Sequence, residues 1–342
     1  MKNKNKQKAS LLRRLVSLLC IIVSVAILAV GGFIIFDRVR HGSFYQDAER
    51  EFIIPGLNDN YTPQGFDYLP ESDLYIMCGF MSDDTVSRIY TVDAKYQSSD
   101  AIIIKNSDGS DHKSHTSGIS VLPGTDHVYL AGDNIIHLLS LADITDGDGV
   151  ATILSDISIM LDPAYCTVRG DMLYVGSYYY PDKYETPMAD RYVTPTGEQN
   201  YALLAAYPLD PTTGLLASDI PDVLYSTRGM IQGMAFADDD TLIFSTSWGL
   251  STSHLYCYDL TAVDPAKAQT YTLADGTEMP ILFLDSSSLY ADIAAPSMSE
   301  ELVVKDGRVF IMNEAACNKY VFGKLLGAHR LFSYPIPGKE AK

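Results

Sequence analysis

The stretch QGFDYLPESDLYIMCGFMSDDTVSRIYTVD, residues 64–93, contains three short apolar segments separated by turn-forming residues. The segments are Gln64–Tyr68, Leu74–Met77 and Arg88–Asp93, and aromatic and β-branched residues of the kind that favour strands recur in them. No 3.6-residue hydrophobic period is sustained after Arg50, so long helices are not expected there. The stretch therefore predicts a unit of short strands joined by turns.

This unit recurs along the chain. From the first residue of the first segment to the centre of the second segment there are 11 residues in the units that begin at Gln64, Gln232 and Ser299, and 12 in the unit that begins at Ser117. The second-segment centres lie 54, 45, 69 and 67 residues apart, a spacing typical of propeller blades with insertions. These centres are Tyr75, Tyr129, Tyr174, Ile243 and Phe310.

A fourth apolar segment follows four of the five triplets, and an unassigned segment, Phe52–Ile54, precedes the first triplet. Because Phe52–Ile54 can complete the fifth blade and close the ring, we predict an all-β, five-bladed β-propeller over residues 51–337. A sixth, degenerate blade within Tyr271–Tyr290 and a two-sheet sandwich remain alternatives. The predicted fourth strands are Ala101–Lys105, Ala151–Leu154, Asp222–Ser226 and Ile281–Asp285.

In architecture, this pattern resembles the secreted and membrane-anchored β-propellers of bacteria, of the broad type in which inner strands begin with Gln-Gly or Ser-Gly. The dipeptides Gln64-Gly65, Ser117-Gly118 and Gln232-Gly233 carry the resemblance. It covers about residues 51–337 and rests on blade spacing. The resemblance implies a ring-shaped domain with a central site, and it transfers no activity.

An apolar segment, Leu15–Phe36, precedes the repeats. Its 22 residues contain no charge and no proline, and as a helix they would extend for about 33 Å, enough to cross a bilayer. Six basic residues precede it, which predicts a cytoplasmic N-terminus under the positive-inside rule. A cleaved signal peptide, a lipoprotein signal and a buried core helix are the alternatives. Phe33–Phe36 argues against cleavage, because it continues the apolar run beyond the small residues Ala29–Gly32.

We therefore predict a single-pass protein of the cell membrane whose propeller is extracytoplasmic. The predicted parts are a basic cytoplasmic tail at 1–14, a transmembrane signal-anchor helix at 15–36, a linker at 37–50, the propeller at 51–337 and a tail at 338–342.

Charge is divided sharply along the chain. The first 40 residues hold eight basic residues and one acidic residue, whereas the remainder holds 17 basic and 42 acidic residues, a net charge of −25. Such an acidic domain argues against nucleic acid as a partner and against a domain that lies on anionic lipid. It agrees with solubility at a cell surface, and binding of divalent cations is the sharper alternative.

The four cysteines outside the apolar segment are widely spaced and form no CxxC motif, so no zinc site is expected. We predict buried free thiols, with a Cys78–Cys317 bridge as the alternative. No nucleophile elbow, metalloprotease motif, P-loop or dinucleotide fingerprint is found. Asp143, Asp146 and Asp148 resemble part of a calcium loop, but their spacing is wrong and no closing glutamate follows. We thus expect no cofactor and no metal ligands, with calcium as an open alternative.

Propeller geometry predicts which residues meet. The innermost strands begin near the axis on one face, and the second strands end at that same face, so residues at these positions converge. We expect a ligand-binding ring there, with Glu300, His115 and Glu314 as candidates for acid–base catalysis. The other converging positions are Ser117, Ser299, Asp133 and Tyr178. The predicted ligand-binding residues are Gln64, His115, Tyr165, Gln232, Trp248, Glu300, Asn313 and Glu314.

Two features add to this ring. Trp248, the only tryptophan, suits stacking on a sugar or gripping a peptide, or else it packs against the next blade. The 23-residue insertion Tyr178–Asn200 contains five tyrosines, which argues for an ordered flap over the ring face or a cover for a blade edge.

These features favour a binding module for a carbohydrate, a peptide or a protein partner. An extracytoplasmic hydrolase or lyase is the alternative. Glycosidase chemistry is weakened because Glu300 and Glu314 fall in one predicted blade, and a scaffold without a ligand also stays open.

Overall fold

The computed structural model describes residues 2–320 and 322–339, and the chain divides into two compact units, Met1–Gln46 and Asp47–Lys342. The first unit contains helix α1, Lys2–Arg40, and nearly all of helix α2, Gly42–Asp47. Within α1, Leu12–Arg40 is long and apolar enough to cross a membrane, although a signal sequence would fit the same length and composition.

The predicted linker, residues 37–50, contains little irregular chain. Residues 37–40 continue α1, because they contain no glycine or proline that would end it, and α2 and the start of β1 occupy most of the rest. Residues 340–342 of the predicted C-terminal tail, residue 1 of the predicted N-terminal tail and residue 321 of the predicted propeller lie outside the described residues.

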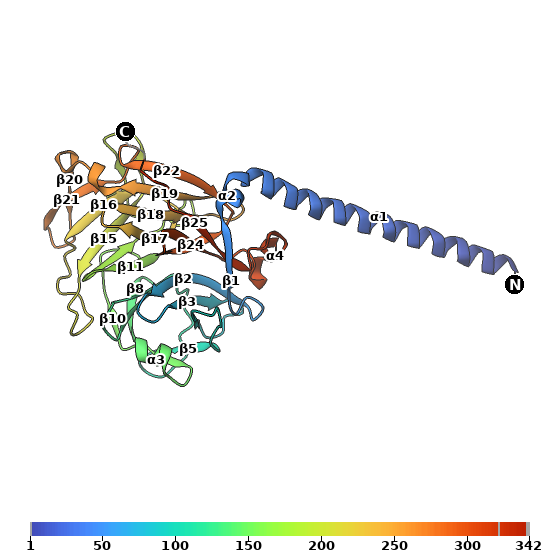
Figure 1. The fold of residues 1–342 in the computed structure, drawn as a ribbon, viewed down its shortest axis with the longest axis horizontal. Helices are drawn as coiled ribbons and strands as arrows, with labels where there is room; N and C mark the ends of the chain where they lie inside the picture. The colour runs from blue at the N-terminus through green and yellow to red at the C-terminus, as the bar shows by residue number, and fades with distance from the viewer. Residues whose placement is uncertain (1, 321, 340–342) are drawn as a thin grey trace. The chain divides into compact units, whose positions relative to one another are not determined.

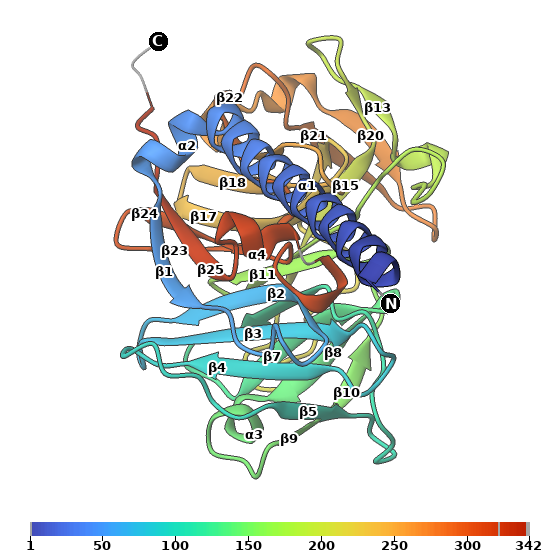
Figure 2. The same ribbon diagram turned by 90° about the vertical axis from the view of Figure 1, so that its right-hand side faces the viewer.

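The second unit is a five-bladed β-propeller (Figures 1 and 2), as the sequence predicts. The innermost strands of successive blades pack side by side, and the first packs against the last, so the blades form a ring. In order from the axis outward, the blades are β2 (Tyr61–Leu69), β3 (Leu74–Met81), β4 (Arg88–Val92) and β5 (Ile102–Lys105); β6 (Gly118–Val121), β7 (His127–Gly132), β8 (Ile135–Ser140) and β10 (Ser155–Ile157); β11 (Tyr165–Arg169), β12 (Met172–Gly176), β15 (Ala202–Pro208) and β16 (Val223–Thr227); β17 (Ile231–Asp238), β18 (Thr241–Thr246), β19 (Ser253–Asp259) and β22 (Leu289–Ala295); and β23 (Ser299–Lys305), β24 (Arg308–Asn313), β25 (Arg330–Pro335) and β1 (Glu49–Ile53).

The ring is closed by β1, which pairs antiparallel with β25 as the outer strand of blade 5 (Figures 1 and 2). Phe52 on β1 is 2% exposed, and its ring lies 4.9 Å from the ring of Tyr75 in blade 1. The first strand of the domain thus completes the last blade and also joins the core between blades 5 and 1. The predicted closure by Phe52–Ile54 is confirmed.

Two of the predicted fourth strands are wrong. Strand β9, Val150–Thr152, pairs parallel with β5 and so extends blade 1, whereas β10 is the fourth strand of blade 2. The hairpin of β20, Gln269–Thr272, and β21, Glu278–Phe283, likewise extends blade 3, because β21 pairs parallel with β16. This hairpin occupies the place proposed for a sixth blade. Both additions cover an outer blade edge that would otherwise expose unpaired backbone groups.

The inner strands approach one another closely at two of the Gln-Gly dipeptides. A Cβ atom on Gly65 would lie 2.6 Å from the backbone nitrogen of Ile119 in blade 2, and one on Gly233 would lie 2.4 Å from the Cα atom of Glu301 in blade 5. Glycine at these positions therefore lets neighbouring blades touch near the axis.

The cores lie mainly between blades and contain the cysteines of the propeller. Cys78, Cys166, Cys257 and Cys317 are buried and free, as predicted, and no Cys78–Cys317 bridge is formed. Burial raises the pKa of the Cys78 thiol to about 12, so it is an unreactive packing residue at neutral pH.

Candidate functional site

Three of the five inner strands contain a β-bulge near the end at which they begin. The extra residue is Gln64 in β2 and Gln232 in β17, and in β23 the register shifts across Glu300 and Glu301. The pairing of β6 and β11 with their neighbours is regular. Because a bulge changes the direction of a side chain relative to the pleat, it can present a residue toward the axis that would otherwise be in a blade interface.

Gln64, Glu300 and Glu314 converge at this end of the ring. The side-chain amide of Gln64 donates to Glu314 Oε2 at 3.1 Å and to the carbonyl of Pro63 at 2.8 Å. Glu314 follows β24, and its N–H donates to the carbonyl of Met298 at 3.1 Å. Blades 1 and 5, which are far apart in sequence, thus join through one amide–carboxyl hydrogen bond.

The Glu300 side chain is 2% exposed, and its Oε1 atom has no hydrogen-bond partner among the described residues. Ser245 of blade 4 donates from its hydroxyl to the Glu300 carbonyl, which holds the bulge in place. A buried carboxyl oxygen without a partner is costly unless a proton, a water molecule or a ligand satisfies it.

The two carboxyl groups influence each other. Burial raises the pKa of Glu300 well above its usual range, and the negative charges of Glu314 and then Glu301 raise it further. Burial also raises the pKa of Glu314 to about 7, against the opposing effects of Lys319 and the Gln64 hydrogen bond. Since two like charges at this separation repel, the pair retains a proton near neutral pH.

An exposed rim surrounds the pair. His115 is exposed, and its ring stacks on Phe80 with centroids 4.5 Å apart. Lys319, on the turn Asn318–Tyr320, is also exposed, with its Nζ atom 4.8 Å from the Phe80 ring centroid. Desolvation lowers the pKa of His115, and the nearby Lys319 charge lowers it further. The site therefore grades from charged and aromatic groups at the surface to the buried carboxyl of Glu300.

Trp248 is covered by the start of the insertion. Tyr180 stacks on it with centroids 3.8 Å apart, and the ring centroid of Tyr184 lies 6.1 Å from it in an edge-on arrangement. Tyr178 donates to the carbonyl of Ser247 at 3.0 Å, and its pKa is raised by burial and then by the charge of Glu300. The first part of the insertion thus lies beside the carboxyl pair.

The rest of the insertion covers an edge. It contains the turn Met188–Asp190 and a hairpin of β13, Tyr192–Val193, with β14, Gln199–Asn200. Tyr271 of the added strand β20 donates to Asp190 at 2.9 Å. The insertion therefore combines the two predicted roles, a cover near the ring face and a cover for a blade edge.

Three predicted ring residues have other surroundings. Tyr165 is fully buried in the core between blades 3 and 4, with its ring centroid 6.3 Å from that of Phe244. Asn313 is buried and stabilises its own loop, because its amide donates to Ser297 and its oxygen accepts from Ala315. Gln232 occupies the bulge equivalent to Gln64 but is only half-buried, and it has no hydrogen bond to the carboxyl pair.

The remaining predicted positions are structural or peripheral. The hydroxyl of Ser117 donates to the carbonyls of Ala131 and Pro163, that of Ser299 donates to Pro296, and Asp133 has a positive φ in the turn after β7.

The sequence prediction missed Glu301, which the same bulge turns toward the neighbouring inner strand. It is 1% exposed, and its Oε1 atom accepts from the N–H of Met234 in blade 4 at 2.6 Å and from its neighbour Leu302 at 3.2 Å. Burial raises its pKa well above the usual range. A signal was present, because Glu301 stands where the two Gln-Gly dipeptides have glycine.

The acidic segment Asp143–Asp148 overlaps helix α3, Leu141–Thr145, in which Asp143 receives the capping bond from Ser140. Within residues 2–320 and 322–339, no group of three or more His, Cys, Asp or Glu side chains is arranged to hold a metal ion.

No protein-family model and no curated protein matches this sequence. Among solved structures, the PQQ-bound aldose sugar dehydrogenase of Streptomyces coelicolor is 15% identical with a TM-score of 0.45, over 86% of this chain and 82% of that one. Myxococcus xanthus glutaminyl cyclase is 9% identical with a TM-score of 0.43, over 84% and 94%. The WD40 repeats of RRP9 are 8% identical with a TM-score of 0.42, over 85% and 98%. Similarity at this level gives no argument about activity.

Proposed function

We propose that this protein is a single-pass membrane protein whose extracytoplasmic propeller binds a peptide at the axial face, through an amino group that pairs with Glu300 and Glu314. The observation that carries the proposal is the coupled carboxyl pair, with one member half-buried and the other buried with an unpartnered oxygen. A ligand ammonium group can replace the shared proton and supply charge-assisted hydrogen bonds to both groups.

Charge supports a cationic ligand. The chain after residue 40 has a net charge of −25, which attracts positively charged molecules and increases their association rate. Lys319 at the rim compensates only part of this negative charge. A carbohydrate is less favoured, because Tyr180 already covers one face of Trp248, the side chain best suited to stack on a sugar.

The membrane topology is part of the proposal. It rests on the apolar segment within α1 and on the basic residues that precede it. Protease added to intact cells should degrade the propeller and leave a small membrane-bound fragment. A mature N-terminus after Gly32 in the culture medium would instead identify a cleaved signal peptide.

The ligand class is tested by calorimetry on the full chain in detergent micelles at pH 7. The probe is a lysine-containing tripeptide with a free N-terminus, measured in buffers of different ionisation enthalpy. We expect binding with release of up to about one proton, because the ammonium group displaces the proton of the pair. Glu314→Gln should abolish the release and weaken binding, whereas Glu278→Gln on the exposed strand β21 should change neither.

The outcomes separate the ligand classes. Binding of maltotriose without proton release would favour a carbohydrate and contradict the amine proposal. Equal effects of the Glu314 and Glu278 variants would show that the peptide recognises only the general acidity of the domain.

A specific observation also favours acid–base catalysis as a second candidate. The pKa of Glu314, raised to about 7, is near the value that is best for proton transfer at neutral pH. If the protein is a hydrolase or lyase, Glu314→Gln should lower its turnover of a cleaved substrate by about 10²–10⁴-fold while binding persists. Unchanged turnover in that variant would exclude Glu314 as the acid–base group.

A further inference from the structure

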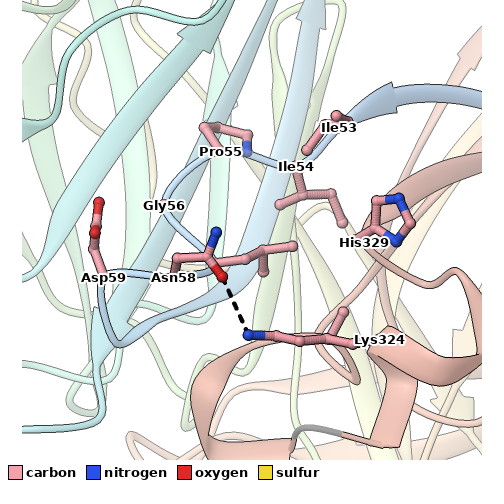
Figure 3. Close-up of a pocket in the computed structure, with 10 residues that line it drawn as sticks. Ile53, Ile54, Pro55, Gly56, Asn58, Asp59, Lys324 and His329 are labelled. Atoms are coloured by element: carbon pink, nitrogen blue, oxygen red, sulfur yellow. Dashed lines mark hydrogen bonds between the residues drawn. The ribbon is translucent and has the colours of Figure 1, made fainter.

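A cavity lies between the β1–β2 connection and the segment that contains helix α4, Phe322–Leu326 (Figure 3). Its volume is about 600 Å³, which is within the usual range for small-molecule sites. None of the axial residues Gln64, Glu300 and Glu314 lines it. It is therefore a feature separate from the proposed peptide site.

The walls of this cavity are divided by polarity. The buried side chains of Ile54, Leu57 and Ala316 provide an apolar surface. Asn58, Asp59, Lys324 and His329 provide the polar groups, and Figure 3 shows Lys324 reaching from α4 toward Asn58. Such a site suits a molecule with one apolar part and one polar group.

The charge of Lys324 is not neutralised by its hydrogen-bond partners. Its Nζ atom donates to Asn58 Oδ1 at 3.2 Å and to Asn318 Oδ1 at 2.9 Å, and both acceptors are neutral amide oxygens. The exposed side chain remains able to donate a further bond to a ligand.

His329 reports a positive potential at the same place. Its pKa is lowered, first by desolvation and then by the charges of Arg330 and Arg50. Arg330 donates to the carbonyl of Glu51 at 2.7 Å, and Arg50 donates to that of Leu326 at 3.4 Å, so these bonds do not neutralise either guanidinium. In a domain with a net charge of −25, such a local excess of cations is unexpected for solubility alone.

We propose that this cavity binds a small organic oxyanion, with its phosphate or carboxylate group between Lys324 and His329 and its apolar part against Ile54, Leu57 and Ala316. Charge-assisted hydrogen bonds from Lys324 and the His329 ring fix the anionic group. Burial of the apolar part adds hydrophobic stabilisation, about 25 cal/mol per Å² removed from water. Asp59 limits the size and orientation of the anion, because it is the one carboxylate among the lining residues.

The test uses the full chain in detergent micelles and four probes. Phenyl phosphate and benzoate carry both features of the proposed ligand, inorganic phosphate carries only the anion, and benzyl alcohol carries only the apolar ring. We expect phenyl phosphate or benzoate to bind at least tenfold more tightly than either partial probe, as measured by calorimetry.

The variants then locate the site. Lys324→Gln should weaken binding by about tenfold, which corresponds to about 1.4 kcal/mol, and His329→Gln should also weaken it. Lys267→Gln removes an exposed lysine elsewhere, beside Asp264, and should leave the affinity unchanged. Unfolding midpoints of all three variants should match the native chain, which excludes loss of fold as the cause.

Three results would overturn the proposal. They are no binding of either aromatic anion at millimolar concentration, equal weakening by the Lys324 and Lys267 variants, and equal affinity for benzyl alcohol. None of these results depends on whether the axial site binds a peptide.

Discussion

Replacement of Glu301 by glutamine should make the propeller more stable as the pH rises. The Glu301 carboxyl is fully buried, and its pKa in the folded state is raised well above the ordinary value of 4.5 because of burial. The folded protein therefore keeps this proton at a pH where the unfolded chain has released it. The stability contributed by the protonated group is complete below pH 4.5 and is lost as the pH rises toward the folded-state pKa.

The magnitude follows from this linkage. Each pH unit between 4.5 and the folded-state pKa costs the native protein about 1.4 kcal/mol for this one group. Glutamine keeps the shape and can keep the acceptor oxygen for the N–H groups of Met234 and Leu302, but it does not titrate. The stability difference between the Glu301→Gln variant and the native protein should therefore grow by about 1.4 kcal/mol per pH unit above pH 5 and flatten at the folded-state pKa.

The assay is urea unfolding of the full chain in detergent micelles, followed by circular dichroism at several pH values from 5 to 8. Glu278→Gln, on the exposed strand β21, is the control for removal of one negative charge from an acidic domain. A difference in unfolding free energy that stays constant across this pH range would refute the reasoning, because it would mean that Glu301 is ionised in the folded state.

Two substitutions test the ring itself. Phe52→Ala should destabilise the domain by about 3–5 kcal/mol, because Phe52 is 2% exposed between blades 5 and 1, whereas Ile53→Ala on the same strand should cost far less because Ile53 is 56% exposed; equal thermal unfolding of the two variants would contradict the closure. Gly233→Ala should cost about 1–3 kcal/mol, because the new Cβ atom would lie 2.4 Å from a backbone atom of the next blade, and Gly338→Ala, which meets nothing within 4 Å, is the control; a Gly233 variant as stable as its control would show that the blades can separate there without cost.

The blade count could be predicted from the sequence because strand spacing repeats, and because the unassigned segment Phe52–Ile54 matches the strand missing from the last blade. The outer strands could not be assigned in the same way. Residues 150–152 and 281–283 are apolar and short, as fourth strands are, but they pair with the preceding blade. Apolar alternation predicts that a segment is a strand, and it does not say which edge the strand joins.

The candidate site shows the same division. Gln64, Glu300 and Glu314 could be placed together because they occupy equivalent positions of a ring, and the structure does join Gln64 to Glu314. Tyr165 holds the same position in β11, but that strand has no bulge, and its ring packs in the core between blades. A bulge shifts the register by one residue, and this shift was not read from the sequence.

The dipeptide at the start of the inner strands links the fold to the site. Glycine at positions 65 and 233 lets adjacent blades approach, and the residue before it is the one that the bulge re-aims. In β23 the corresponding dipeptide is Glu300-Glu301, so a carboxyl group replaces the missing glycine contact and bonds to the Met234 backbone of blade 4. Two adjacent buried carboxyl groups raise the free energy of the folded state unless both are protonated or matched by a partner. That Glu301 has a backbone partner for one oxygen, while Glu300 Oε1 has none, is the physical reason to look for a ligand at Glu300 and for a structural role at Glu301.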